Sequence, residues 1–232
     1  MNRKYKRLFK HEQNEGHFWP SFTDLLTTIL LCFILIFIAM MIIKSLQIDE
    51  MKRTIDQIMG VRKQLVSELN NEFNSDDEMG IDIDEKTGAI IFDTEILFAY
   101  DDDELKDESF AFLDEFVPRY LDVLLASDYE DYVAEIIIEG HTDRDGSYLY
   151  NLELAQNRAY SVASYLLGDD FPDKTIQNEL EQKLTVNSKS FTDFRTDENG
   201  EYSADASRRV EFKFRLKDEE ILAKTRDILF NE

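Results

Sequence analysis

The sequence is poor in the residues that build many common functional sites. It holds one Cys and three His among 232 residues, which excludes an intrachain disulfide and leaves no His pair at metal-ligand spacing. Basic residues are also scarce, 26 against 49 acidic, for a formal net charge of -23. Because phosphate backbones are held by clustered Lys and Arg, this balance excludes a nucleic-acid partner. The length suits one modest domain with accessory segments and excludes a large multidomain enzyme.

Charge is unevenly distributed along the chain, and one long segment carries none. Residues 1–44 hold six basic and three acidic side chains, so the other 20 basic and 46 acidic residues all follow Lys44. The 19 residues from Leu25 to Ile43 are uncharged, a length that nearly crosses a hydrocarbon core of about 30 Å. With the flanking aromatic residues, this run predicts a transmembrane helix over residues 19–44.

The flanks of this run predict its orientation. Residues 1–18 form a basic tail with five Lys or Arg in the first ten positions, which predicts a cytoplasmic N-terminus, and Trp19 suits the membrane interface. The acidic remainder then lies outside the bacterial inner membrane. A cleaved signal peptide is the alternative, but the apolar run is longer than a signal needs and no small-residue cleavage site follows it.

Asp24 stands directly before the apolar run, and Thr27 and Thr28 follow one turn later. A carboxylate in a membrane segment is costly, and such residues usually mark ion pathways. We therefore interpret Asp24 as an ion-relay residue, with Thr27 and Thr28 as further ligands for a proton or a sodium ion. The alternative is that Asp24 only caps the helix N-terminus, where a carboxylate offsets unpaired amides.

Residues 45–78 are predicted to form a short coiled coil and a linker. Apolar residues recur there at spacings of three and four, interrupted by Arg62, which is the a/d pattern of a heptad repeat. The pattern favours a parallel homodimer that continues from paired membrane helices. The alternative is a single amphipathic helix that packs on the chain's own domain. The residues of this seam are Ile48, Met51, Ile55, Ile58, Leu65 and Leu69.

The remainder alternates strand and helix signals, which predicts one compact α/β domain over residues 79–216 and an amphipathic C-terminal helix over 217–232. The polar stretch from Asp193 to Ala206 predicts a surface loop, and the acidic run from Asp101 to Glu104 predicts a solvated helix start rather than a calcium site. The expected strands are 81–84, 89–92, 134–139 and 208–214, and the expected helices are 110–125 and 149–167.

One motif places charged side chains where a strand ends and a helix begins. Asp143 lies in the polar turn after the strand, and Arg158 comes from the following helix. An acid and a base at one pocket can hold a zwitterionic ligand with a free ammonium and a carboxylate, although a structural ion pair is the alternative. His141 has no His partner at the spacing of metal ligands, so the sequence does not favour a metal site or a bound cofactor. It does not favour an enzyme either.

Residues 139–159 resemble the peptidoglycan-binding motif of OmpA-like domains, with Thr-Asp, Gly, Asn, Leu and Arg-Ala at the family's spacing. Arg208, Arg209 and Val210 resemble that family's closing strand, although Ser207 stands where Asn is common. The resemblance implies a periplasmic α+β sandwich whose Asp and Arg grip the amine and carboxylate of the cell-wall peptide's diamino acid. The implied binding residues are Thr142, Asp143, Asn151, Leu154, Arg158 and Arg208.

The N-terminal segment resembles the stator B subunits of ion-driven motors, the MotB type, in which an aromatic stretch precedes a membrane Asp and a Leu/Thr-rich helix. Residues from Phe18 to Phe37 are more similar still to the ZorB subunits of the Zorya anti-phage defence system. The resemblance implies a homodimer, a pentamer of a MotA- or ZorA-like membrane subunit as partner, and anchorage to peptidoglycan. A flagellar MotB-like stator and a structural membrane-to-wall tether that transports no ion are the alternatives.

Overall fold

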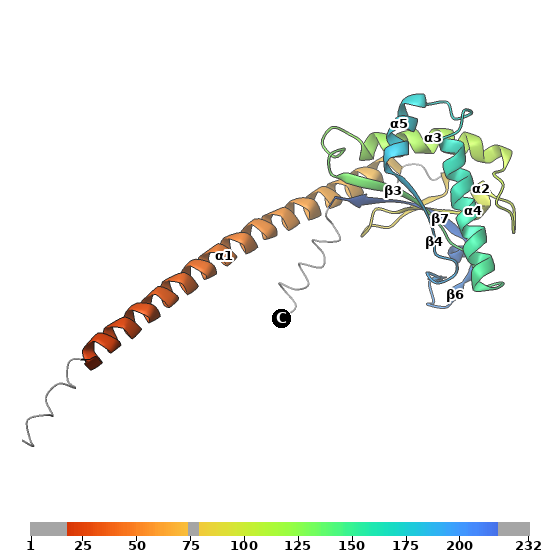
Figure 1. The fold of residues 1–232 in the computed structure, drawn as a ribbon. Helices are drawn as coiled ribbons and strands as arrows, with labels where there is room; N and C mark the ends of the chain where they lie inside the picture. The colour runs from red at the N-terminus through yellow and green to blue at the C-terminus, as the bar shows by residue number, and fades with distance from the viewer. Residues whose placement is uncertain (1–17, 74–78, 218–232) are drawn as a thin grey trace, which may run out of the picture. The chain divides into compact units, whose positions relative to one another are not determined.

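The computed structural model describes residues 18–73 and 79–217. The predicted tail up to residue 17, the end of the predicted linker (74–78) and the C-terminal helix from residue 218 lie outside the described residues. The first element is one long helix, α1 (Phe18–Phe73) (Figure 1). Contacts along the chain divide it between Thr54 and Ile55, within α1, so the two parts are described separately.

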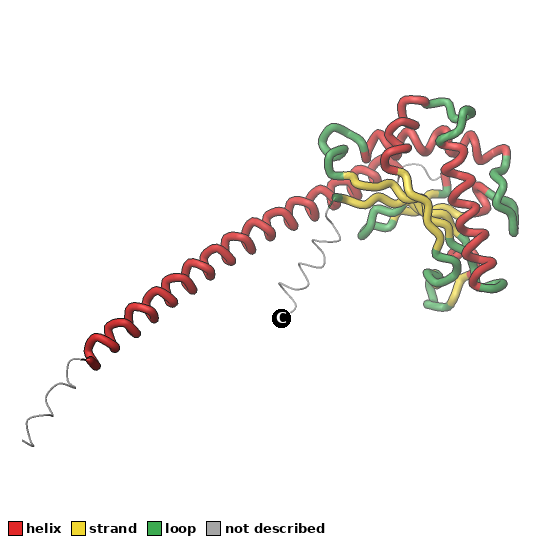
Figure 2. Tube along the Cα trace, viewed as in Figure 1, coloured by secondary structure: helices red, strands yellow, loops and turns green. Residues whose placement is uncertain are grey.

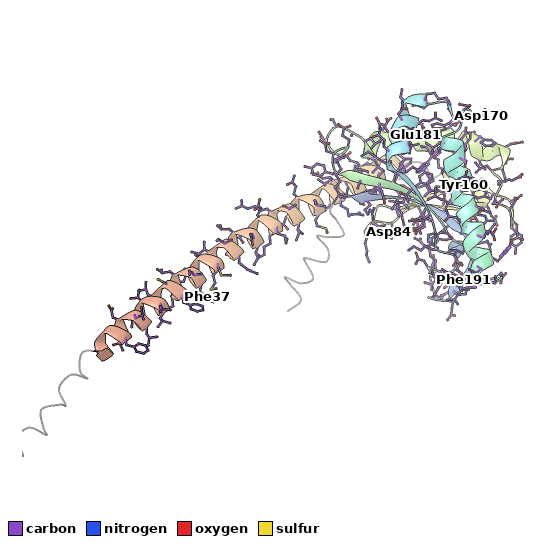
Figure 3. All side chains as sticks on the ribbon, viewed as in Figure 1. Phe37, Asp84, Tyr160, Asp170, Glu181 and Phe191 are labelled. Carbon is purple, nitrogen blue, oxygen red and sulfur yellow. The ribbon has the colours of Figure 1, made fainter. Side chains whose placement is uncertain are left out.

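The first part of α1 is long and apolar enough to cross a membrane by length and composition, as predicted. Every side chain from Leu25 to Ile43 is exposed, and Figure 3 shows Phe37 projecting from the helix. A helix that is apolar all round requires lipid or other helices around it. Asp24 lies inside α1, and residues 18–23 before it are already helical, so Asp24 is not the N-cap. The capping alternative for Asp24 is therefore wrong.

The second part folds as a sheet with helices packed against it (Figure 2). The sheet has five strands in the order β1-β2-β7-β3-β4, and it is mixed because only β3 and β4 pair in parallel. Its strands are β1 (Ile81–Ile83), β2 (Ile90–Asp93), β3 (Val133–Gly140), β4 (Leu184–Ser188) and β7 (Arg209–Leu216). The helices are α2 (Thr94–Leu97), α3 (Asp107–Leu124), α4 (Tyr148–Leu166), α5 (Lys174–Lys183) and α6 (Ala204–Ser207).

Residue alternation along β7 decides which face of the sheet meets the helices. Val210, Phe212 and Phe214 point into the apolar core, since successive strand residues face opposite sides. The Phe212 ring meets the ring of Phe116 from α3 edge to face, with centroids 5.0 Å apart. The residues between them, such as Lys213, lie on the other face, which carries charged side chains.

The last turns of α1 belong to this core rather than to a coiled coil. Leu65 and Leu69 are 0% exposed, and Phe73 packs against Phe116 with ring centroids 5.4 Å apart. Arg62 fits the same packing, because its Nη1 donates to the Thr87 carbonyl at 2.6 Å. Three-and-four spacing is common to coiled coils and to helices that pack on their own domain. From Ile55 onward the structure therefore favours the amphipathic-helix alternative, and the dimer stays a prediction.

Most of the expected strands and helices are confirmed within one to three residues, and two segments differ. The expected loop from Asp193 to Ala206 contains a hairpin of β5 (Arg195–Thr196) and β6 (Tyr202–Ser203), followed by α6. The run from Asp101 to Glu104 is not a helix start, since α3 begins at Asp107. Acidic residues favour loops and helix N-termini alike, so composition did not separate the two. Helix α5 buries only Leu180, which explains why periodicity missed it.

Candidate functional site

A cavity forms where β3 ends, α4 and β7 begin, and the loop after α2 passes by. All six residues that the sequence predicted for ligand binding line it: Thr142, Asp143, Asn151, Leu154, Arg158 and Arg208. The sequence missed the opposite wall, which is lined by Thr94, Glu95, Phe98, Ala99, Tyr100 and Asp101. The motif residues and a distant segment of the chain therefore meet at one site.

Two glycines bring the motif together. Gly140 ends β3, and a Cβ added there would lie 2.2 Å from the Ala155 carbonyl oxygen, so only glycine lets β3 approach α4 this closely. Gly146 has φ +94°, a conformation that other residues rarely adopt. The turn then passes to Ser147, which caps α4 by accepting a hydrogen bond from the Tyr150 amide. This geometry holds the turn against the helix that carries the binding arginine.

Asp143 is held in a fixed orientation at the cavity wall. Its Oδ1 accepts a hydrogen bond from the Asp145 amide at 3.0 Å, and its Oδ2 pairs with Nη1 of Arg208 at 2.9 Å. The hydrogen bond to Asp143 raises the pKa of Arg208, and Asp205 adds to the effect. Asp143 itself is 7% exposed, so its carboxylate is largely withdrawn from water. Its charged partner is therefore the closing-strand arginine that the sequence predicted as part of the site.

Arg158 is nearly buried and holds the loop that forms the opposite wall. Its Nε donates to the Asp102 carbonyl at 2.7 Å and its Nη2 to the Ala99 carbonyl at 3.5 Å. Burial lowers the pKa of Arg158, and nearby carboxylates led by Asp101 oppose that effect. The structure does not pair Asp143 with Arg158, so the simple ion-pair alternative does not hold. Nη1 of Arg158 donates no hydrogen bond to any described residue and is available to a ligand.

The loop from Ala99 to Asp103 is fixed by further contacts with α4. The Tyr150 hydroxyl donates to Oδ1 of Asp101 at 2.5 Å, and Asn157 donates to Asp103 at 2.8 Å. The bond to Asp101 raises the pKa of Tyr150. Asp101 has φ 60°, a strained value for a residue other than glycine. Asp101, the first residue of the acidic run that was expected to start a helix, is thus part of the cavity wall.

The remaining motif residues differ in their roles. Asn151 donates from Nδ2 to the Asp145 carbonyl at 2.7 Å and so fixes the turn. Thr142 is 3% exposed, and its Oγ1 has no hydrogen-bond partner among the described residues. Buried polar atoms are normally satisfied, so an orphaned hydroxyl in a cavity wall indicates a missing ligand group or water. Leu154 supplies apolar surface to the same wall.

A second cluster of titratable residues includes the end of β3. Glu139, His141 and Asp193 each offer one possible ligand atom, and these atoms lie within 4.8 Å of one another. Lys213 pairs with Glu139, and Arg209 pairs with Asp193, so their charges are already balanced. Burial opposes ionisation of Glu139, but contacts with His141 and Lys213 outweigh it and lower its pKa to about 2. These pairs disfavour a divalent cation there.

Comparison with known proteins agrees with this fold. A model of the OmpA family matches residues 97–207, the stretch that contains the motif, so the second part of the chain is an OmpA-like α/β domain. Zorya protein ZorB from the Crooks strain of Escherichia coli is 30% identical over 218 residues, covering 90% of this chain and 91% of that protein. The chain therefore belongs to the ZorB family.

Two further matches complete the comparison. Zorya protein ZorB from Escherichia coli O139:H28 is 29% identical over 217 residues, covering 90% of this chain and 85% of that protein. The crystal structure of a putative MotB-like protein from Desulfovibrio vulgaris is 21% identical, with a TM-score of 0.47, and covers 71% of this chain and 99% of that one.

Proposed function

We propose that the chain is the peptidoglycan-binding B subunit of an ion-driven inner-membrane motor, acting in Zorya anti-phage defence, with Asp24 as its ion-relay carboxylate. The observation that carries the proposal is the cavity, because six residues chosen from sequence for one ligand all line it. Membership of the ZorB family supports the assignment to a Zorya system. In this proposal the N-terminus is cytoplasmic, the OmpA-like domain is periplasmic, and a ZorA-like subunit is the membrane partner.

The cavity offers complementary groups to a diamino acid of the peptidoglycan peptide. Asp143 presents an oriented carboxylate to a ligand ammonium, and the free Nη1 of Arg158 presents a donor to a ligand carboxylate. The unpartnered hydroxyl of Thr142 supplies one more hydrogen bond. Charge-assisted hydrogen bonds in a largely buried site are stronger than neutral ones. A zwitterionic ligand therefore fits the site better than an anion or a neutral sugar would.

Replacing Asp143 tests the binding half of this proposal. Losing one partner of a desolvated charge pair costs about 2–5 kcal/mol, which is more than tenfold in affinity. We expect the full chain in detergent to pellet with purified peptidoglycan, and Asp143→Ala to pellet at least tenfold more weakly. Glu153→Ala is the control, since it removes an exposed carboxylate from α4 outside the cavity. Unchanged pelleting of folded Asp143→Ala would refute the site.

The ion-relay half of the proposal rests on the position of Asp24. It lies in the second turn of α1, just before the uncharged run, and its carbonyl accepts hydrogen bonds from the hydroxyls of Thr27 and Thr28 at 2.9 and 2.8 Å. Those bonds satisfy the hydroxyl protons within the helix and leave oxygen lone pairs for an ion. A carboxylate in this position is retained at a cost, which indicates a use in transport.

Asp24→Asn separates a motor from a passive tether. We expect it to abolish phage protection in cells that carry the complete gene cluster, with normal amounts of the protein in membranes, because removing the charge favours insertion. Asp49→Asn makes the same change on the same helix outside the apolar run, and it should protect normally. Full protection by Asp24→Asn would support the tether, and restored swimming of a stator-deficient strain would support a flagellar MotB-like role.

A further inference from the structure

The hairpin formed by β5 and β6 contacts the residue that follows Asp143. The guanidinium of Arg144 lies over the Phe194 ring at 3.9 Å from its centroid and over the Tyr202 ring at 4.5 Å. The two rings touch each other edge to face, with centroids 6.0 Å apart. The Tyr202 hydroxyl also accepts a hydrogen bond from the Arg144 amide at 2.9 Å. The side chain of Arg144 thus lies against both rings, and its backbone amide is bonded by Tyr202. We call Phe194 and Tyr202 the aromatic clamp.

The segment that carries the clamp is anchored by hydrogen bonds to residues at and just before the start of β7. Arg209, which is fully buried at the start of β7, donates to the carbonyl and the carboxylate of Asp193 at 2.9 and 3.2 Å. The Arg195 amide donates to the Ser207 hydroxyl at 3.0 Å, which ties the beginning of the segment to its end. The donor, Arg209, is buried, and charge-assisted hydrogen bonds are stronger than neutral ones. The rings of the clamp are therefore held by the sheet and not by an independent loop.

The stretch from Asp193 to Ser207, which carries the hairpin and α6, helps to position both members of the ion pair between Asp143 and Arg208. Its hairpin holds Arg144, the neighbour of Asp143, and its last helix leads directly into Arg208, which pairs with Asp143 at 2.9 Å. Asp205 in that helix pairs with Arg208 as well, and so orients the guanidinium. Because this segment fixes the positions of both the Asp143 carboxylate and the Arg208 guanidinium, it determines the geometry of the group that would bind a ligand ammonium.

We propose that Phe194 and Tyr202 are positioning residues for the peptidoglycan site, which act by clamping Arg144 and thereby fixing the carboxylate of Asp143. This inference rests on the proposed function, since it assumes that Asp143 binds the ligand. Neither ring lines the cavity, so the clamp acts through the turn and not by touching the ligand. Cation–π contacts and one hydrogen bond supply enough interaction to change affinity by about tenfold when they are lost.

The test measures peptidoglycan affinity of the full chain in detergent by co-sedimentation. We expect Tyr202→Ala to weaken binding about tenfold and Phe194→Ala by less, because the latter leaves the bond from the hydroxyl to the Arg144 amide intact. Tyr202→Phe should lie between Tyr202→Ala and the unmodified chain. Tyr160→Ala is the matched control, because it removes an exposed tyrosine ring from α4 (Figure 3) and should bind normally.

Combining Tyr202→Ala with Asp143→Ala separates positioning from direct contact or general destabilisation. If the clamp acts through Asp143, the double variant binds no more weakly than Asp143→Ala alone. If the double variant binds a full tenfold more weakly than Asp143→Ala, the clamp is overturned. The clamp is also overturned if Tyr202→Ala binds normally while Asp143→Ala binds weakly. Normal binding by Asp143→Ala would instead overturn the proposed function, and the clamp with it.

Discussion

Leu65→Ala should destabilise the OmpA-like domain strongly, although position 65 belongs to the seam that the sequence read as a coiled coil. The side chain is 0% exposed and lies in the same apolar cluster as Phe116 and Phe212. Truncating a buried leucine removes its transfer free energy and leaves a cavity, which together cost about 2–5 kcal/mol. The higher helix propensity of alanine returns only a few tenths of a kcal/mol.

For a domain of this size, each kcal/mol shifts the melting temperature by about 2–4 °C, so a loss of about 2–5 kcal/mol gives an expected fall of roughly 4–20 °C. This fall in melting temperature is measured by thermal unfolding of the full chain in detergent, with near-ultraviolet circular dichroism of the tyrosines as the signal. Met59→Ala is the matched control, because Met59 lies on the same helix and is 47% exposed. That change should alter stability by about 0.5 kcal/mol or less.

A coiled-coil origin of the seam would give a different result. Stability that comes from pairing with a second chain depends on protein concentration, whereas packing within one chain does not. We expect the melting temperatures of the unmodified chain and of Leu65→Ala to stay constant over a hundredfold dilution. Equal melting temperatures for Leu65→Ala and Met59→Ala, or a loss that grows on dilution, would refute intrachain packing of this helix.

Two further predictions concern pH and pairing. The pKa of Glu139 falls from 4.5 to about 2 on folding, so its contribution to stability is complete above about pH 4.5 and is lost as the pH falls toward 2. The free energy of unfolding of Glu139→Gln should therefore depend less on pH in that window than that of the unmodified chain. An equal dependence would contradict the ion-pair network. Met51→Cys in a Cys32→Ser background should form intermolecular disulfides in membranes more readily than Lys52→Cys, and equal crosslinking at both positions would argue against the predicted dimer.

Local signals in the sequence were sufficient to predict most of the fold and the motif. The alternation along β7 identified the strand because its apolar residues face the core and its charged residues do not. Asp143 and Arg158 could be assigned to one pocket because a strand end and a polar turn lead directly into the helix that carries Arg158. Thr142 was assigned through the resemblance to the OmpA-like motif. Such features depend on elements that follow one another directly in the chain.

The features that the sequence did not reveal depend on contacts between distant segments. The opposite wall of the cavity, with Asp101, is brought to α4 by the Tyr150 hydroxyl and by Arg158. The clamp rings, Phe194 and Tyr202, stand in a polar stretch, where two aromatic residues were the only signal that it packs against anything. Neither the partner nor the direction of such a contact can be read from spacing alone.

The packing of α1 also limits how two copies of the chain can pair. Once the residues from Ile55 onward serve the domain core, only Ile48 and Met51 of the predicted seam stay outside it. A coiled coil needs apolar a/d positions over about three to four heptads, so these two residues are too few to hold a dimer. The run from Leu25 to Ile43 has no repeated small residues at four-residue spacing to bring helices together. The predicted dimer therefore needs contacts beyond those of Ile48 and Met51.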